Sequence, residues 1–242
     1  MKAIIIAGGR GERLRPITDT IPKPMIEVAG KSLLEHTIEM FRHHGIKDII
    51  LALCYLPEVI QDYFGDGTKF GVHITYTFED SSNPLGTAGA ILHARKYIDN
   101  TFIVTYADIL RELDITTMID RHISAGAIAT INAYRHTGNN FKSVLEFDDK
   151  NIIKKFTELE KSQKLEDCFQ WSNGSFYILE PEVFDFISLS GQIDFARHVF
   201  PSMIKANKKV MVFPFDGYFI DIGTNENLDK ARMEFKKIKR IG

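Results

Sequence analysis

The spacing of hydrophobic and polar residues changes along this chain, and the changes predict that strands and helices alternate. Short apolar runs predict strands over residues 3–7, 48–54, 72–78, 102–106, 128–134, 175–179 and 210–215. Apolar residues at helical spacing predict helices over residues 32–44, 57–64, 88–97, 114–125, 181–187, 195–206 and 225–237. Two alternating segments, 144–147 and 152–156, predict an antiparallel hairpin.

The predicted architecture is a single α/β domain: a twisted, mixed but mostly parallel sheet with helices on both faces and an antiparallel insertion in the second half. Residues 3–7 are all apolar, as expected of a parallel strand covered on both faces. At the start of the 32–44 helix, Ser32 and Glu35 have the spacing of a capping box, and Gly45 follows its last turn. No internal repeat or low-complexity linker divides the chain.

Composition narrows the class of protein. Of 242 residues, 44% are hydrophobic and 26% charged, which is ordinary for a globular protein and disfavours disorder, collagen and coiled coil. The formal charge of −2 provides no overall basic field, so neither nucleic acid nor a membrane is expected as a partner. With only Cys54 and Cys168, a disulfide framework is not expected, and the cytoplasm is the expected compartment.

The first predicted strand leads into a glycine-rich loop. Glycine lets backbone N–H groups approach phosphate oxygens closely, although a tight turn without a ligand would have the same residues. A dinucleotide-binding fingerprint would need glycine where Leu14 stands, and no P-loop lysine follows at the required spacing. Cations suited to phosphate crowd the same segment. They are Arg10, Arg13, Arg15 and Lys23.

These residues carry a family resemblance. The segment AGGRGERLRPIT, followed by IPKPMIEVAGKSLLEH, closely resembles the sugar-phosphate nucleotidyltransferases, whose pattern is GGxGxRLxPLT and then PKPMxPxxGKPxLxH. Later blocks follow in the family's order: LGTAGA at residues 85–90, Asp108 after a strand, NGSFY at 173–177 and YFIDIGT at 218–224. The resemblance therefore extends over nearly the whole chain.

The resemblance implies a Rossmann-like fold and an enzyme that joins a nucleoside triphosphate to a sugar 1-phosphate, releasing pyrophosphate. Residues 1–110 are expected to form the nucleotide-binding half and residues 111–242 the sugar-phosphate-binding half. Arg13 and Lys23 are the implied catalytic cations, because the sugar phosphate attacks the α-phosphorus in line and charge must be neutralised. Asp108 and Asp221 are the implied ligands of Mg²⁺. The implied nucleotide-binding residues are Ala7, Gly8, Gly9, Gly11, Arg13, Gly86 and Thr87.

The sugar half departs from the family pattern. Leu159 occupies the position of a lysine that commonly faces the sugar phosphate, while Glu158 beside it is retained. We predict that Lys142 takes over this contact; alternatively Lys142 is a solvated lysine at a strand edge, and Lys161 is the nearest other cation. The residues expected to bind the sugar phosphate are Lys142, Glu158 and Asn173.

Within the family, the chain looks most like the guanylyltransferases for mannose 1-phosphate or a heptose 1-phosphate, so GTP is the expected nucleotide. Uridylyl or thymidylyl transfer to a hexose 1-phosphate is the alternative. A nucleotide-sugar-dependent glycosyltransferase and a catalytically silent nucleotide-sugar sensor are two further hypotheses. Arg13 and Lys23 around the glycine loop argue against both. The sequence leaves homo-oligomer formation open.

Overall fold

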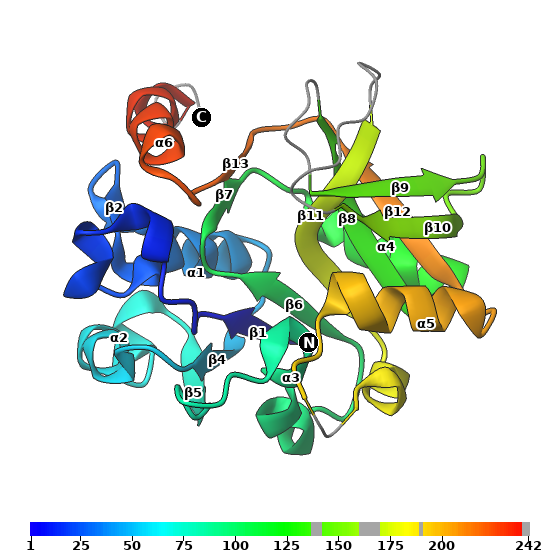
Figure 1. Cartoon of the computed structure of the whole chain (residues 1–242), viewed down its shortest axis with the longest axis horizontal. Helices are drawn as coiled ribbons and strands as arrows, with labels where there is room; N and C mark the ends of the chain where they lie inside the picture. Colours follow the sequence, from blue (N-terminus) through cyan, green and yellow to red (C-terminus); the bar gives the residue numbers. More distant parts are fainter. Residues whose placement is uncertain (137–141, 160–169, 189–190, 239–242) are drawn as a thin grey trace. The chain divides into compact units, whose positions relative to one another are not determined.

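The computed structural model describes residues 1–136, 142–159, 170–188 and 191–238 (Figure 1). The chain divides into two units, each built from segments far apart in the sequence. The first, here named the amino-terminal unit, contains Lys2–Asn83, Tyr106–Glu112 and the described part of Tyr218–Gly242. The second, the central unit, contains Met1 and the described parts of Pro84–Thr105 and Leu113–Gly217. The expected halves, 1–110 and 111–242, stay a prediction, because packing alone does not say what each part binds.

Three parallel strands form the sheet of the amino-terminal unit. The middle strand, β4 (Asp48–Leu53), pairs with β1 (Lys2–Ile6) on one side and with β5 (His73–Phe78) on the other. Ala3, Ile4 and Ile5 of β1 are fully buried, as the apolar run predicts for a parallel strand covered on both faces. Because the strands are parallel, the loops that follow them all begin at the carboxyl ends of the strands, where ligands commonly bind in α/β folds.

Two helices accompany this sheet. Helix α1 (Leu33–His43) begins at Ser32, whose hydroxyl accepts a hydrogen bond from the Glu35 N–H at 3.1 Å, so the predicted cap is confirmed. Helix α2 (Pro57–Phe64) begins at a proline, whose missing N–H is harmless in a first turn.

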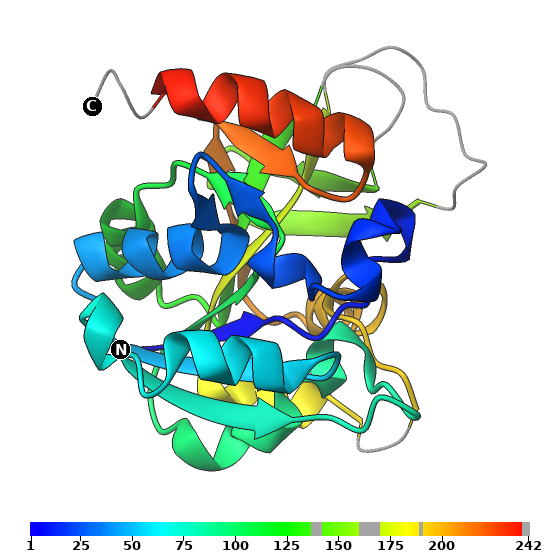
Figure 2. The ribbon, with the colours of Figure 1, turned by 90° about the vertical axis from the view of Figure 1, so that its left-hand side faces the viewer.

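Smaller elements complete the amino-terminal unit. Two short antiparallel pairs, β2 (Glu27–Val28) with β3 (Lys31–Ser32) and β7 (Ile109–Arg111) with β13 (Phe219–Asp221), precede α6 (Asn225–Ile238). Figure 2 shows α6 beside β13 and β2. Apolar side chains from these distant segments share one core, which fixes the loops between them. The core includes Leu14, Ile26, Leu110, Ile220 and Ile222.

Four strands form the sheet of the central unit, in the order β12 (Val210–Phe215), β8 (Ala129–His136), β11 (Gln170–Leu179) and β6 (Phe102–Tyr106). The β12–β8 pair is parallel, and β11 runs antiparallel to both of its neighbours. Helix α4 (Ile115–Ala125) begins at Asp114, whose carboxylate accepts the Thr117 N–H at 3.0 Å. A 3₁₀ turn, Pro181–Phe186, follows β11.

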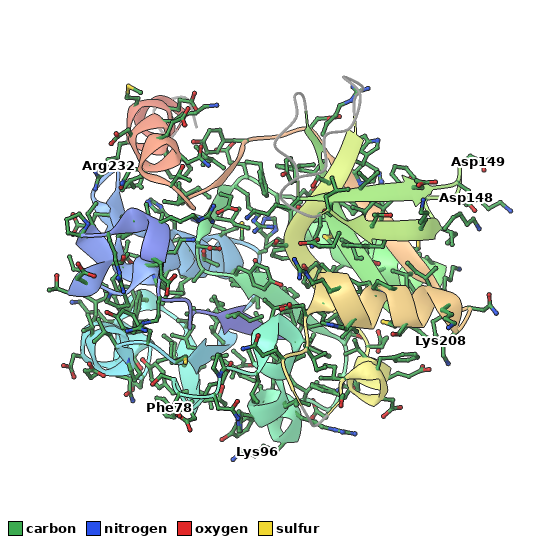
Figure 3. All side chains as sticks on the ribbon, in the orientation of Figure 1. Phe78, Lys96, Asp148, Asp149, Lys208 and Arg232 are labelled. Carbon is green, nitrogen blue, oxygen red and sulfur yellow. The ribbon has the colours of Figure 1, made fainter. Side chains whose placement is uncertain are left out.

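The predicted hairpin is confirmed. Its strands are β9 (Ser143–Phe147) and β10 (Ile153–Glu158), which pair antiparallel with Glu158 opposite Ser143. Asp148 and Asp149 lie at the turn, at the far end of the hairpin from Glu158 (Figure 3).

Two predicted helices are interrupted. The 88–97 helix is instead a single turn, α3 (Gly86–Gly89), followed by a 3₁₀ segment, Leu92–Tyr97. The 195–206 helix begins as a π-helical turn, Phe195–Val199, and continues as α5 (Phe200–Lys205). The second interruption has a local cause: Pro201 has no N–H to donate to the preceding turn, so the regular hydrogen-bond ladder is broken there.

Parallel and antiparallel pairings, surrounding helices and the hairpin confirm the predicted mixed α/β class. Within the described ranges, no helix is both long enough and apolar enough to cross a membrane.

Candidate functional site

The end of β1 is where the predicted nucleotide loop begins. The Ala7 N–H continues the pairing with β4 by donating to the Ala52 carbonyl at 2.9 Å. The Ala107 N–H donates to the Ile6 carbonyl at 3.1 Å, so the chain that leads to Asp108 also reaches this strand end. The glycine loop and Asp108 therefore lie at the same end of the strands.

Two of the three loop glycines are required by packing. A Cβ on Gly8 would lie 2.7 Å from the Cys54 Cβ. Gly11 has a φ of +66°, and a Cβ there would lie 2.9 Å from a methyl carbon of Thr18. By contrast, a Cβ on Gly9 would meet nothing within 4 Å. The open backbone at Gly9 is thus the part of the loop that a phosphate could approach.

The two outer arginines of the loop have surface partners. The Arg10 guanidinium lies 5.3 Å from the centre of the Tyr55 ring, and Arg15 forms an exposed pair with Asp19 at 3.1 Å. The Tyr55 hydroxyl in turn donates to the Thr18 carbonyl at 3.2 Å. These contacts brace the loop and do not single out either arginine as a ligand.

Lys23 forms the central ion pair of the site. Its ammonium donates to Oδ2 of Asp108, and its side chain is only 11% exposed against 30% for Asp108. Lys23 opens a 3₁₀ turn, Lys23–Met25, and its Cβ lies 3.2 Å from where a Cβ on Gly11 would be. A cation buried this far requires an anionic partner. The turn therefore fixes a positive charge beside the glycine loop.

A backbone hydrogen bond holds the segment of Asp221 next to Asp108. Asp221 ends β13, where it pairs with Ile109 of β7, and the Ile222 N–H donates to the Asp108 carbonyl at 2.9 Å. The Asn227 side-chain amide also donates to the Asp221 carbonyl, at 2.7 Å. Asp108, in the turn just before β7, and Asp221, at the end of β13, thus have their backbones held side by side.

Arg13 reaches the same place. A Cβ on Gly223 would lie 2.8 Å from Nη2 of Arg13 and 3.2 Å from Oδ1 of Asp221. Only glycine leaves room for the two side chains to converge there. Four predicted residues, Arg13, Lys23, Asp108 and Asp221, are therefore brought together inside one unit. We name them the charged quartet.

The two carboxylates of the charged quartet are of the kind that can hold a divalent metal ion. Mg²⁺ in proteins is usually bound by one or two carboxylates, and substrate phosphates and water complete its shell. Asp108 and Asp221 supply two such carboxylates, with Lys23 on one oxygen of Asp108. No group of three or more His, Cys, Asp or Glu side chains suited to a metal occurs among the described residues, so an all-protein cage is not offered there.

The remaining predicted nucleotide residues, Gly86 and Thr87, belong to the central unit. Gly86 has a φ of +80°, and a Cβ there would lie 2.7 Å from the backbone of Ile193. The backbone N–H and the hydroxyl of Thr87 both lie 3.0 Å from Oδ1 of Asp194. No sequence pattern connects this loop with residues 193–195.

Asn173 shapes the bulge in β11. Its side-chain oxygen accepts the Ser175 N–H at 2.9 Å, and its amide group donates to the Tyr177 hydroxyl at 2.9 Å. Ser175, which replaces the glycine usual in the family, has a φ of +53°, and the pairing with β8 shifts register across this segment. The Asn173 N–H is held by the Ser143 hydroxyl at 3.0 Å.

Glu158 and Lys142 are neighbours across the hairpin. The N–H of Leu159 donates to the carbonyl of Lys142 at 2.8 Å, just beyond the Glu158–Ser143 pair. Burial raises the pKa of the Glu158 carboxyl. The positive charges of Arg197 and Lys142 act in the opposite direction. Lys161 lies outside the described residues, as does Cys168.

Asp194 and Arg197 are charged residues whose effect on Glu158 the sequence motifs do not indicate. The negative charge of Asp194 adds to the rise in the Glu158 pKa, whereas Arg197 offsets it. Arg197 belongs to the π-helical turn that continues into α5, and Asp194 immediately precedes it; the sequence predicts only a helix that begins at residue 195. Proximity to Glu158 follows from the packing of the π-helical turn on β10, which no local sequence signal announces.

Comparison with known proteins gives the family. The family model described as nucleotidyl transferase matches residues 2–238. The chain is 36% identical over 236 residues to a UTP-glucose-1-phosphate uridylyltransferase of Synechocystis, covering 92% of this chain and 60% of that protein. It is 33% identical over 229 residues to a mannose-1-phosphate guanyltransferase of Debaryomyces hansenii, covering 92% of this chain and 61% of that protein. It thus spans about three fifths of the length of these relatives.

A solved structure is similar over its whole length. HddC from Yersinia pseudotuberculosis, complexed with GMP-PN, superposes with a TM-score of 0.80 at 28% identity, covering 97% of this chain and 99% of that one. Together with the match of the family model, these likenesses confirm the resemblance carried by the glycine loop and the two aspartate blocks. The chain belongs to the nucleotidyl transferase family.

Proposed function

We propose that this protein transfers a nucleoside monophosphate from a nucleoside triphosphate to a sugar 1-phosphate, giving a nucleotide sugar and pyrophosphate. The observation that carries the proposal is the charged quartet, in which two cations and two carboxylates from four distant segments converge beside an open glycine backbone. Both substrates are highly charged, so the enzyme must above all position them and neutralise charge.

In this proposal the triphosphate lies along Gly8, Gly9 and Gly11. Arg13 offers two parallel N–H donors to phosphate oxygens. Lys23 supplies a compact positive charge for the oxyanion that develops as the sugar phosphate attacks the α-phosphorus. Its low exposure keeps that charge in a water-poor place, where its effect is larger than in solution.

Asp108 and Asp221 would hold Mg²⁺. When bound, the ion would neutralise phosphate charge and help to align the reacting groups. The protein's own contribution is to keep both carboxylates in place: β7 and β13 fix their backbones, and Asn227 holds the carbonyl of Asp221. Enzymes of this family generally depend on a divalent metal.

We further propose that Lys142, Glu158 and Asn173 bind the sugar 1-phosphate. Lys142 is exposed and adjoins Leu159, where the family usually has its phosphate-binding lysine. Arg197 is the second candidate cation, because its charge acts on the same carboxyl of Glu158. Glu158 itself could accept hydrogen bonds from sugar hydroxyls.

The preferred substrates are GTP with mannose 1-phosphate or a heptose 1-phosphate, and the expected compartment is the cytoplasm. The solved relative complexed with GMP-PN and the mannose-1-phosphate guanyltransferases support a guanine nucleotide. The uridylyltransferase relative supports the alternative, uridylyl or thymidylyl transfer to a hexose 1-phosphate.

A substrate matrix tests the proposal. The purified protein would be given each of five nucleoside triphosphates with a panel of sugar 1-phosphates and Mg²⁺, and pyrophosphate release would be measured. We expect one preferred pair, with no release when either partner or the metal is omitted. Consumption of a nucleotide sugar by an acceptor, without triphosphate, would instead indicate a glycosyltransferase. Tight binding of a nucleotide sugar with no turnover in either assay would indicate a sensor.

A further inference from the structure

The loop that contains Gly86 and Thr87 is tied to one other segment of the central unit. Ile193 donates its N–H to the Leu85 carbonyl at 2.7 Å, and its own carbonyl accepts the N–H groups of Ala88 at 2.8 Å and Gly89 at 3.2 Å. Gly86 packs so closely on this backbone that no side chain would fit. The shape of the loop is therefore set by residues more than a hundred positions away in sequence.

Asp194 supplies the charged part of this connection. Its Oδ1 accepts from both the N–H and the hydroxyl of Thr87, each at 3.0 Å, and the Thr87 oxygen accepts the Phe195 N–H at 3.1 Å. A threonine has one backbone and one side-chain donor, and Asp194 takes both. In this arrangement Thr87 has no donor left for a nucleotide, so its main task is to hold the loop.

The segment that carries Asp194 is itself anchored. The Asp194 N–H donates to Nδ1 of His198 at 2.9 Å. Phe195 is fully buried and packs on Tyr177 of β11, with ring centres 5.2 Å apart, and on Phe200, with ring centres 5.5 Å apart. A rigid anchor lets a single carboxylate impose its position on a glycine-containing loop, which would otherwise sample many conformations.

We propose that Asp194 is a positioning residue, which holds the Leu85–Gly89 loop in the shape that binds the nucleotide. The inference rests on the proposed function, because it takes that loop as part of the nucleotide site. Asp194 acts through Thr87 and does not itself contact the substrate. A carboxylate that accepts two hydrogen bonds forms stronger contacts than a neutral acceptor, so its loss should be measurable.

The test compares variants of both partners. Asp194→Ala should raise the apparent KM for the triphosphate about tenfold or more, because the charged hydrogen bonds that shape the loop are lost. The KM for the sugar 1-phosphate should change much less. Thr87→Val should have a similar effect, Thr87→Ser should restore most of the affinity, and the double variant should be no worse than Asp194→Ala alone, because both changes remove the same interaction.

A matched control is available in the same unit. Asp185→Ala removes a carboxylate that is 70% exposed and lies 3.8 Å from Arg95, so it should leave both KM values unchanged. If Asp194→Ala raises both KM values equally, or lowers only the melting temperature, Asp194 has a general structural role and the proposal is wrong. The same conclusion follows if Asp194→Ala behaves like Asp185→Ala.

A second measurement separates this proposal from the proposed function. Amide hydrogen exchange at residues 87–89 in the free protein should accelerate in Asp194→Ala and not in Asp185→Ala. Titration calorimetry with GTP and with UTP then measures nucleotide affinity without turnover. An inactive wild type with faster exchange and weaker nucleotide binding in Asp194→Ala would refute only the transferase function. Unchanged exchange, or faster exchange with unchanged nucleotide affinity, would overturn the role of Asp194.

Discussion

The charged groups of the amino-terminal unit and those around Glu158 in the central unit are held in different ways. In the charged quartet, Lys23 and Asp108 form a largely buried pair, and backbone hydrogen bonds fix both aspartates. Around Glu158, the two cations Lys142 and Arg197 are exposed. A fixed arrangement suits chemistry on phosphate, which every substrate pair shares, whereas exposed cations on a hairpin and a helical turn can be exchanged as the sugar changes.

Departures from the family pattern follow the same division. By the resemblance, Arg13, Lys23, Asp108 and Asp221 themselves match the family, although Tyr106 and Ala107 replace the Asn-Gly that usually precedes Asp108. In the central unit, Leu159 and Ser175 replace the usual lysine and glycine. We name the charged quartet the fixed region and Lys142, Glu158 and Arg197 the adjustable region. The fixed region keeps the four charged residues of the family pattern, whereas the lysine beside Glu158 is missing from the adjustable region. Substitutions in the first should abolish turnover, and substitutions in the second should change mainly how the sugar phosphate is bound.

The largest effect is expected at the two carboxylates. Asp108→Asn or Asp221→Asn keeps the shape but removes a hard anionic ligand, so turnover should fall on the order of a thousandfold, with more Mg²⁺ needed for what remains. Initial rates over a Mg²⁺ titration provide the measurement. Full activity with an unchanged titration in either variant would make that aspartate a turn residue and remove it from the metal site.

The two cations should come next. Arg13→Ala or Lys23→Ala should lower turnover about a hundredfold or more, because each charge offsets phosphate charge in a water-poor site. Circular dichroism should show that both variants still fold. Exposed Arg15, which pairs with Asp19, provides the control: Arg15→Ala should keep near-wild-type kinetics. If Arg13→Ala or Lys23→Ala did the same at saturating Mg²⁺, that cation would have no part in catalysis.

A glycine pair tests whether the exact arrangement matters. Gly223→Ala would place a Cβ 2.8 Å from the Arg13 guanidinium, so this flexible side chain must move and turnover should drop roughly thirtyfold, with little loss of stability. Gly9→Ala meets nothing in the protein, so any change in its triphosphate KM reports ligand approach. Equal melting temperatures with equal kinetics for wild type and Gly223→Ala would show that Arg13 need not be held there.

Much of the fixed region could be predicted from the sequence, because its signals are local. The apolar run before the glycines, the Ser32 cap and the aspartates after short strands each report on their immediate neighbours. The convergence of Arg13 and Asp221 on Gly223 could not be derived from spacing, since their segments are far apart in the sequence and meet only in the folded unit. The family resemblance alone placed both residues in one site.

The contacts of the central unit were harder to predict for a physical reason. Asp194 bonds to Thr87 across 107 positions, and the charge of Arg197 acts on Glu158 because the π-helical turn packs on β10. The spacing of apolar residues predicts a helix over residues 195–206. The π-helical turn before Pro201 changes the directions in which the side chains of that turn leave the helix axis. The nearness of the Arg197 charge to Glu158 therefore follows from tertiary packing, and the sequence pattern does not contain it.

A smaller effect separates the two candidate cations of the sugar phosphate. Lys142→Ala should raise the KM for sugar 1-phosphate about tenfold, because a charged hydrogen bond to a dianion is lost, and should leave the triphosphate KM nearly unchanged. Adding Leu159→Lys should restore part of the loss. If Arg197→Ala has this signature and Lys142→Ala does not, Arg197 holds the phosphate. Equal small effects on the KM values of both substrates in both variants would mean that neither Lys142 nor Arg197 binds the sugar phosphate.

The smallest expected effect is a pH-dependent change in melting temperature on substitution of Glu158. Burial raises the pKa of this carboxyl in the folded protein, so the folded state binds its proton more tightly than the unfolded state does. This term favours folding at acidic pH, and it is lost as the pH rises from the unfolded pKa through the raised folded one. Because the group is partly exposed and Arg197 and Lys142 offset the burial, Glu158→Gln should raise the melting temperature at neutral pH by at most about 2 °C. Melting curves of the wild type and Glu158→Gln between pH 4 and pH 8 measure this change. The gain in melting temperature of Glu158→Gln over the wild type should grow with pH. A gain that shrinks would mean that the two cations outweigh burial and that Glu158 is held as tightly as the quartet.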